Sequence, residues 1–144
     1  MVPTLLGRLQ TRVFVLATIG VLLTLLVTPI LPTSASLGDA YRATFGVLVT
    51  VAVLGLLWEF VYHGLQQFRW EKDWPTMFGL VTGLNEGLLV WLLVSAGAVP
   101  GADGVTGRAF MIHFVVVWIG VWLFVNGPMR VPFLRWRFRG GRLV

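Results

Sequence analysis

The sequence predicts an all-α integral membrane protein, in which four transmembrane helices form one compact bundle over residues 1–144. The first observation is composition: 57% of the residues are hydrophobic and 12% are charged, whereas soluble domains carry about 25% charged residues. The second is four apolar runs, each close to the ~20 residues that cross ~30 Å of hydrocarbon. They lie at about 13–31, 44–66, 76–98 and 109–126. The connectors are too short to hold a soluble domain.

The distribution of basic residues predicts the orientation. Nine of the eleven Lys and Arg residues fall in segments 1–12, 67–75 and 127–144, which lie on one side of a four-span protein. Because cytoplasmic loops carry the excess of Lys and Arg, both termini are expected in the cytoplasm. The ten arginines beside a single lysine fit a GC-rich bacterial genome. We therefore expect a multi-pass protein of a bacterial inner (plasma) membrane.

The amino-terminal region is interpreted as a retained helix. Its apolar run of ~18 residues exceeds the 7–15 residues of a signal-peptide core. Residues 1–12, which contain Arg8 and Arg12, are expected to form a short interfacial helix ahead of it. The chain has no cysteine, which excludes disulfides, thiolate metal sites and iron–sulfur clusters.

Two glutamates, Glu59 and Glu86, lie within the second and third apolar runs. A carboxylate in hydrocarbon costs at least ~2.5–3.5 kcal/mol and needs a partner, a proton or water. Counted from Lys72 in the intervening loop, Glu59 is 13 residues back and Glu86 is 14 residues forward. In a helical hairpin both would lie on the order of 20 Å from the loop. If they meet, we expect one of them to hold a proton.

The second span carries a polar stripe, made by Gly55, Glu59, His63, Gln66 and Trp70 at spacings of 4, 4, 3 and 4. At 100° per residue these positions share one face. Such a stripe faces protein or water rather than lipid. The pattern is consistent with either a proton-handling site or an internal polar clasp that holds the helices together.

The third span carries Gly79, Gly83 and Gly87, which form a double small-xxx-small motif that favours close helix packing. Gly55 and Gly120 are expected to serve packing in the second and fourth spans. Polar residues accompany the third-span glycines, and we group them with those of the second span as the predicted polar seam. Its members are Glu59, His63, Gln66, Thr82, Asn85 and Glu86.

The carboxyl-terminal tail, residues 128–144, nearly alternates arginines and aromatic residues. Such a segment can lie at the membrane surface, with its arginines on anionic headgroups at ~1 kcal/mol each. Trp118 and Trp122 share a face of the fourth span and are expected to contact lipid or a partner. The tail residues expected to contact lipid or a partner protein are Arg130, Arg135, Trp136, Arg137, Arg139 and Arg142.

Cofactor chemistry finds little support in the sequence. A haem between His63 and His113 meets a depth mismatch of ~10 Å along the two helices. A metal site built from Glu59, His63 and Glu86 has too few ligands compared with four-helix di-iron proteins. No nucleophile elbow, phosphate-binding loop or zinc-protease motif occurs. We therefore expect no catalytic residues, no metal and no cofactor, apart from bound lipid.

These features predict a small non-catalytic accessory or assembly subunit of a larger bacterial membrane complex, such as a respiratory or cell-envelope complex. Its expected partners are membrane lipids with anionic headgroups and either other membrane subunits or further copies of itself, with no role for nucleic acid. The alternative is a small proton-coupled transporter, or a proton- or cation-conducting protein, that uses Glu59, His63 and Glu86 as a relay.

Overall fold

The computed structural model describes residues 2–144, and all regular elements in that range are helical. Four helical segments are long and apolar enough to cross a membrane: Leu5–Ile30, Leu37–Gln67, Thr76–Ser95 and Gly107–Arg130. The prediction of four helices is confirmed. The elements are α1 (Leu5–Val15), a π-helical segment η1 (Leu16–Gly20), α2 (Val21–Val27), the 3₁₀ turn η2 (Thr28–Ile30), α3 (Leu37–Gln67), α4 (Thr76–Ser95), α5 (Gly107–Asn126), the 3₁₀ turn η3 (Pro128–Arg130) and α6 (Leu134–Phe138).

The first helical segment differs from the expectation at its amino end. Residues 5–12 form no separate interfacial helix but are the first turns of α1, which continues through η1 into α2. The hydroxyl of Thr4 caps α1 by accepting a hydrogen bond from the Gly7 amide at 3.1 Å. Arg8 and Arg12 therefore lie within a continuous helix, where their side chains point in fixed directions.

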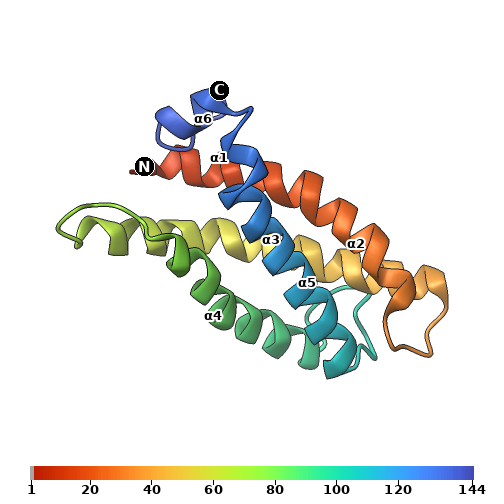
Figure 1. Ribbon diagram of the computed structural model, residues 1–144. Helices are drawn as coiled ribbons and strands as arrows, with labels where there is room; N and C mark the ends of the chain where they lie inside the picture. Colours follow the sequence, from red (N-terminus) through yellow and green to blue (C-terminus); the bar gives the residue numbers. More distant parts are fainter. Residues whose placement is uncertain (1) are drawn as a thin grey trace.

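The four helical segments pack as a ring. The first segment (α1 to α2) packs on α3 and α5, and α4 also packs on α3 and α5. Both chain ends lie at one end of the bundle (Figure 1), where the Thr4 amide donates to the Gly140 carbonyl at 2.9 Å. The loop 68–75 reaches the same end, because the Gln66 amide group bridges Pro3 and Lys72. We call this end the terminal end.

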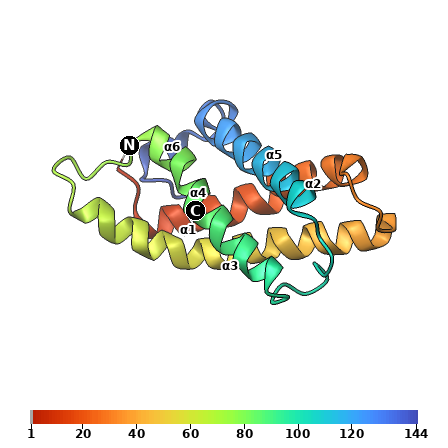
Figure 2. The same cartoon turned by 90° about the horizontal axis from the view of Figure 1, so that it is seen from below.

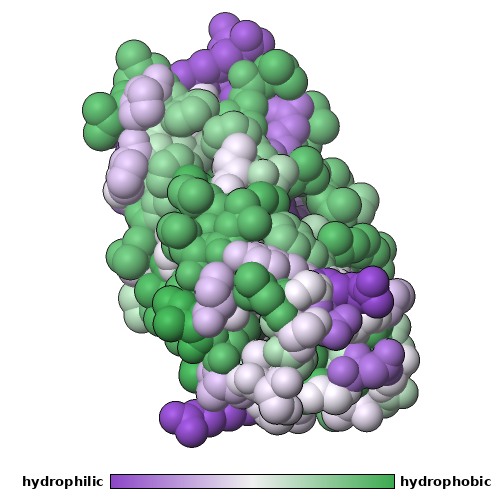
Figure 3. Space-filling model, turned by 90° about the vertical axis from the view of Figure 1, so that its right-hand side faces the viewer, coloured by the Kyte–Doolittle hydropathy of each residue, from purple (hydrophilic) through white to green (hydrophobic). Residues whose placement is uncertain are grey.

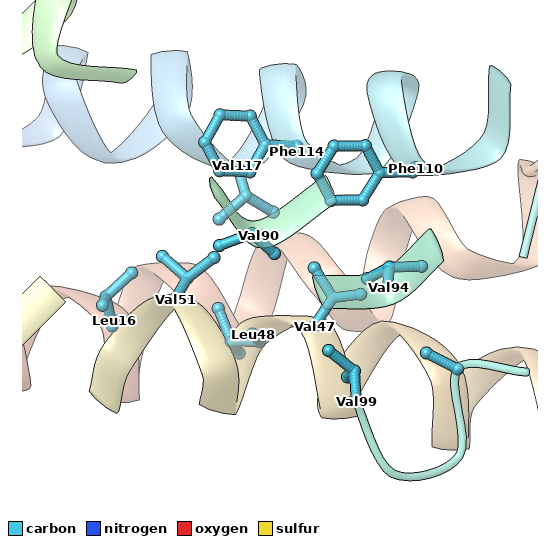
Figure 4. Packing of buried hydrophobic residues seen from close by; sticks show 11 residues of the cluster. Leu16, Val47, Leu48, Val51, Val90, Val94, Val99, Phe110, Phe114 and Val117 are labelled. Atoms are coloured by element: carbon cyan, nitrogen blue, oxygen red, sulfur yellow. The ribbon is translucent and has the colours of Figure 1, made fainter. Parts of the chain in front are cut away.

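The apolar core lies between the helices in the half of the bundle away from the terminal end. Figure 4 shows Val47, Val51, Val90 and Val117 from three helices converging in this core. On the outside, hydrophobic residues cover most of the face in Figure 3, and hydrophilic residues gather at its top and lower right. The molecule therefore has a large apolar surface in addition to an apolar core.

The glycines of α4 face a row of aromatic residues on α5. A Cβ built on Gly83 would lie 2.5 Å from Nε1 of Trp118, and one built on Gly87 would lie 2.7 Å from Cε1 of Phe114. The indole of Trp118 donates to the Leu80 carbonyl at 3.2 Å. The missing side chains thus allow α5 to approach closely, as small residues do in membrane bundles.

Two tryptophans of α5 correct the expectation that they face lipid or a partner. Trp118 packs on Gly83, and Trp122 packs on Gly79 while its indole donates to the Thr76 carbonyl at 3.0 Å. Both rings therefore join α5 to α4 within the chain. Gly120, on the same helix, approaches Leu23 of α2.

The packing of Trp118 on Gly83 leads to a stability prediction. Gly83→Ala forces the hydrogen-bonded indole to move, so we expect a loss of about 1–3 kcal/mol, as for an overpacked core. Gly64→Ala in α3 is the matched control, because nothing lies within 4 Å of its added Cβ. Alanine favours the helix there by up to ~1 kcal/mol. Thermal unfolding followed by circular dichroism in detergent measures both, and equal melting temperatures would contradict the packing role.

Candidate functional site

The main polar feature of the interior joins three of the four long helical segments near the terminal end. Its members come from α1, α3 and α4 and are named here the arginine–glutamate cluster. The cluster consists of Arg8, Arg12, Glu59, Tyr62, Gln66 and Glu86. Five of its six members are at most 8% exposed, namely Arg8, Glu59, Tyr62, Gln66 and Glu86.

Arg12 is the central member of the cluster. Its Nη1 and Nη2 donate to Oε2 and Oε1 of Glu86 at 2.7 and 2.8 Å, a two-pronged pairing on α4. Its Nε donates to Oε1 of Glu59 on α3 at 2.8 Å. A guanidinium has a planar fork of donors that suits this geometry. One side chain therefore connects α1 to both carboxylates.

Arg8 lies one helical turn before Arg12 and extends the cluster toward the terminal end. Its Nη1 donates to Oε2 of Glu59 at 3.2 Å, while Nε and Nη2 donate to Oε1 of Gln66 at 3.1 and 2.7 Å. Its guanidinium also lies over the ring of Trp74, 4.5 Å from the centroid. Gln66 in turn donates a hydrogen bond through Nε2 to the Lys72 carbonyl in the 68–75 loop.

Tyr62 supplies a further donor to Glu86. Its hydroxyl donates to Oε1 of Glu86 at 3.0 Å and accepts a hydrogen bond from Nδ2 of Asn85 at 2.8 Å. Asn85 therefore reaches the cluster only through Tyr62. Both residues belong to the α3–α4 contact.

The charges in the cluster balance. Two guanidiniums face two carboxylates, and all six guanidinium nitrogens and all four carboxylate oxygens are engaged. Buried ions are tolerated when they are paired and their remaining hydrogen-bonding atoms are satisfied. The Arg12 guanidinium lies between the carboxylates of Glu59 and Glu86 and pairs with both.

Gly55 provides the space that Arg12 occupies. A Cβ at this position would collide with the Arg12 guanidinium. Gly55 lies one turn before Glu59 on α3, so the glycine and the carboxylate together form the receptor for this side chain. The predicted packing glycine thus receives an arginine rather than a helix backbone.

His63 is not part of the cluster, which corrects its place in the predicted seam. It is half-buried, its Nε2 lies 3.5 Å from Nε2 of Gln67, and its Nδ1 is buried without a hydrogen-bond partner. At 100° per residue, Tyr62 and Gln66 lie 60° and 20° to one side of Glu59, whereas His63 lies 40° to the other. The inward face of α3 is therefore centred on the Tyr62 side. Trp70 follows the helix end and is fully exposed.

Thr82 also stays outside the cluster. It is half-buried, and its hydroxyl donates to the Gly79 carbonyl of its own helix at 3.3 Å. Among residues 2–144, no group of three or more His, Asp or Glu side chains is placed to hold a metal ion. The arrangement of Glu59, His63 and Glu86 considered from the sequence does not form.

Sequence reasoning missed Arg8, Arg12 and Tyr62. From the sequence, both arginines contribute to the orientation signal and are expected in an interfacial helix. A signal was present, however, because the two arginines are four residues apart, on one helix face, and two acids within apolar runs require two counter-charges. Tyr62 lies between Glu59 and Gln66 at helical spacing.

The tail residues are split by the structure. Arg130, Arg135, Arg137, Arg139 and Arg142 are exposed. Trp136, however, is 3% exposed, and its indole donates to the Thr11 hydroxyl at 2.7 Å. It therefore anchors α6 to α1, which corrects its expected role as a lipid or partner contact.

A second group of polar side chains lies farther from the terminal end. His113 on α5 pairs through Nε2 with the Thr24 hydroxyl at 3.0 Å, and the hydroxyls of Thr28 and Thr44 lie 2.9 Å apart. The Nδ1 atom of His113 is buried without a hydrogen-bond partner. This group links α2 to α5 and η2 to α3.

The chain matches no protein-family model, no curated protein and no solved structure. Any function proposed for the protein therefore rests on its residues and their geometry.

The cluster predicts a strong dependence of stability on Arg12. Arg12→Gln leaves two buried carboxylates short of a partner, and breaking a buried ion pair in this way costs about 3–5 kcal/mol. Arg69→Gln is the control, because its pair with Asp73 is a half-exposed i,i+4 contact at 3.0 Å, for which ~0.3–0.5 kcal/mol is expected. Thermal unfolding in detergent measures both losses.

A double-mutant cycle tests the pairing itself. Because Arg12→Gln combined with Glu86→Gln removes both charges, its loss should fall short of the summed single losses by at least ~1 kcal/mol. Strictly additive losses would mean that the two side chains do not interact.

Proposed function

We propose that the protein is a small non-catalytic accessory or assembly subunit of a larger complex in a bacterial plasma membrane. The observation that carries this proposal is the saturation of the arginine–glutamate cluster. Every charged atom in it is paired within the chain, which leaves no unpaired base or nucleophile of the kind that catalysis requires. The cluster acts as a clasp that sets the relative position of α1, α3 and α4.

We further propose that the four long helical segments cross the membrane with both termini in the cytoplasm. Their lengths and hydropathy suit the hydrocarbon thickness. The terminal end carries the basic tail and the 68–75 loop, which is the distribution that the positive-inside rule associates with the cytoplasm. The exposed arginines of the tail lie where they can contact anionic headgroups.

We propose that the carboxyl end of α3 is the surface that contacts a partner protein. This helix has 31 residues, about 46 Å by helical rise, which exceeds the ~30 Å hydrocarbon core. Its end and the following loop form the extreme left of the molecule in Figure 2. Phe68 and Trp70 there are 90% and 100% exposed. Exposed aromatic residues are enriched at protein interfaces.

The orientation is tested with single cysteines, which the cysteine-free chain permits. Ser34 and Glu71 are both exposed, in loops at opposite ends of the bundle. With a membrane-impermeant maleimide, Ser34→Cys should label in intact spheroplasts, whereas Glu71→Cys should label only after permeabilisation. The reverse pattern would contradict the proposed topology.

The accessory role predicts a stoichiometric membrane partner. Tagged protein extracted gently from its native membrane should co-purify with at least one other integral membrane protein, identified by mass spectrometry. Phe68→Ser with Trp70→Ser should reduce that recovery severalfold, whereas Phe138→Ser, an exposed residue of the tail, should leave it unchanged.

A lone homo-oligomer would contradict the accessory role and favour the second candidate, a proton-conducting protein. The specific observation in its favour is His113, whose Nδ1 is buried without a hydrogen-bond partner, because this residue lines the same cavity as Arg12 and Glu59. Proton flux in reconstituted liposomes that disappears in His113→Gln would support that candidate. His63 lies outside the cavity lining.

A further inference from the structure

A cavity of about 460 Å³ runs from the terminal end into the bundle, between α1, α3, α4 and α5. Its volume falls in the range of ~300–1,000 Å³ that is typical of small-molecule sites. Along α5, its lining extends from Asn126 to His113. The cavity is a space beside the arginine–glutamate cluster, and Arg12 and Glu59 form part of one of its walls.

Three tryptophans line the outer part of the cavity: Trp74, Trp122 and Trp136. The indoles of Trp122 and Trp136 are held by hydrogen bonds to Thr76 and Thr11. Tryptophan rings are enriched at the level of lipid headgroups. The mouth of the cavity is therefore placed where lipid headgroups lie in the proposed topology.

The charge at the mouth favours an anion. Arg8 is paired with Glu59, and Asp73 is paired with Arg69. Arg130 also lines the mouth, and within residues 2–144 it makes no salt bridge. Its Nη2 donates to Oδ1 of Asn126 at 2.9 Å, which leaves the other guanidinium donors available to a phosphate.

The interior of the cavity is apolar. Val51, Val117 and Val121 line it from α3 and α5. From Asn126 to Val117 is nine residues, about 14 Å by helical rise. One leaflet contributes half of a ~30 Å hydrocarbon core, so an acyl chain reaches ~15 Å. A chain with its headgroup at Asn126 would end beside Val117, before His113.

We propose that this cavity binds one acyl chain of an anionic phospholipid from the surrounding leaflet, with the phosphate at Arg130 and Asn126 and the chain along Val121 and Val117. The proposal depends on the membrane insertion proposed above and is independent of the accessory role. The bound lipid fills the space between α1 and α5 and raises the stability of the bundle by mass action.

The test uses purified, delipidated protein and three soluble probes. Lysophosphatidylglycerol carries one chain and a net negative charge, lysophosphatidylcholine carries one chain and no net charge, and glycerol 3-phosphate has no chain. Native mass spectrometry should show one molecule of lysophosphatidylglycerol bound, with an affinity about fivefold above that of lysophosphatidylcholine, as expected for one arginine near a headgroup. Glycerol 3-phosphate should neither bind nor raise the melting temperature.

Two variants locate the site. Val121→Trp fills the cavity and should abolish one-to-one binding, whereas Val116→Trp, on the exposed face of α5, should bind as the wild type does. Arg130→Gln should weaken lysophosphatidylglycerol about fivefold and remove the preference over lysophosphatidylcholine. Arg135→Gln, an exposed tail arginine outside this cavity, should change neither. Circular dichroism checks that each variant is folded.

Three outcomes overturn the proposal. They are equal binding of lysophosphatidylcholine and lysophosphatidylglycerol by the wild type, undiminished binding by folded Val121→Trp, and binding of free glycerol 3-phosphate. Equally fast modification of Val121→Cys by a charged thiol reagent, with and without lysophosphatidylglycerol, would reveal a water-filled cavity and would also overturn the proposal. Because the assays use the isolated protein, their failure leaves the accessory role untouched, and a missing partner leaves the lipid site untouched.

Discussion

The arrangement of the helices depends on one side chain, Arg12, which lies between two carboxylates. Glu59 and Glu86 belong to neighbouring helices and would repel each other across an apolar interior. The guanidinium pairs with both, at 2.8 Å to Glu59 and at 2.7 and 2.8 Å to Glu86. It can do so because Gly55 lacks a side chain at the point where Arg12 enters. The positions of α1, α3 and α4 are thereby coupled.

This interaction explains the geometry of the bundle better than its stability. Removing charges from water is expensive, and a buried ion pair often contributes no more than well-packed hydrophobic residues would. Hydrogen bonds in bilayers average only ~0.6 kcal/mol. The two-pronged pairing of Arg12 with Glu86 instead fixes the rotation of α4 about its axis. Both carboxylate oxygens of Glu86 can face the Arg12 guanidinium in only one such rotation.

Close apolar packing is seen at the contact of α4 with α5. Gly83 and Gly87 admit the rings of Trp118 and Phe114 at distances that no Cβ would allow. This contact occupies the glycine face of α4 within the chain. The exposed aromatic end of α3 and the cavity at the terminal end are the features that we propose contact other molecules. The first is a surface and the second is an interior space, so they suit different partners.

The helical class of the fold could be predicted from the sequence, because apolar runs of about 20 residues favour helices long enough to span a membrane. The need for polar partners at Glu59, Gln66 and Glu86 could also be predicted, since buried polar residues require hydrogen-bond or charge partners. The identity of those partners could not be predicted from the sequence. From the sequence, Arg8 and Arg12 were expected ahead of the first apolar run. In the structure helix α1 begins at Leu5 and contains both arginines, whose side chains reach the buried glutamates.

What the tertiary structure alone decided is the rotation of each helix about its axis. Helical spacing placed Tyr62 and His63 on adjacent directions of α3, and the sequence could not say which one faced inward. Packing against α1 and α4 turned the helix toward Tyr62 and left His63 half-buried at the edge. Sequence periodicity specifies which residues share a face, whereas the contacts between helices determine what that face meets.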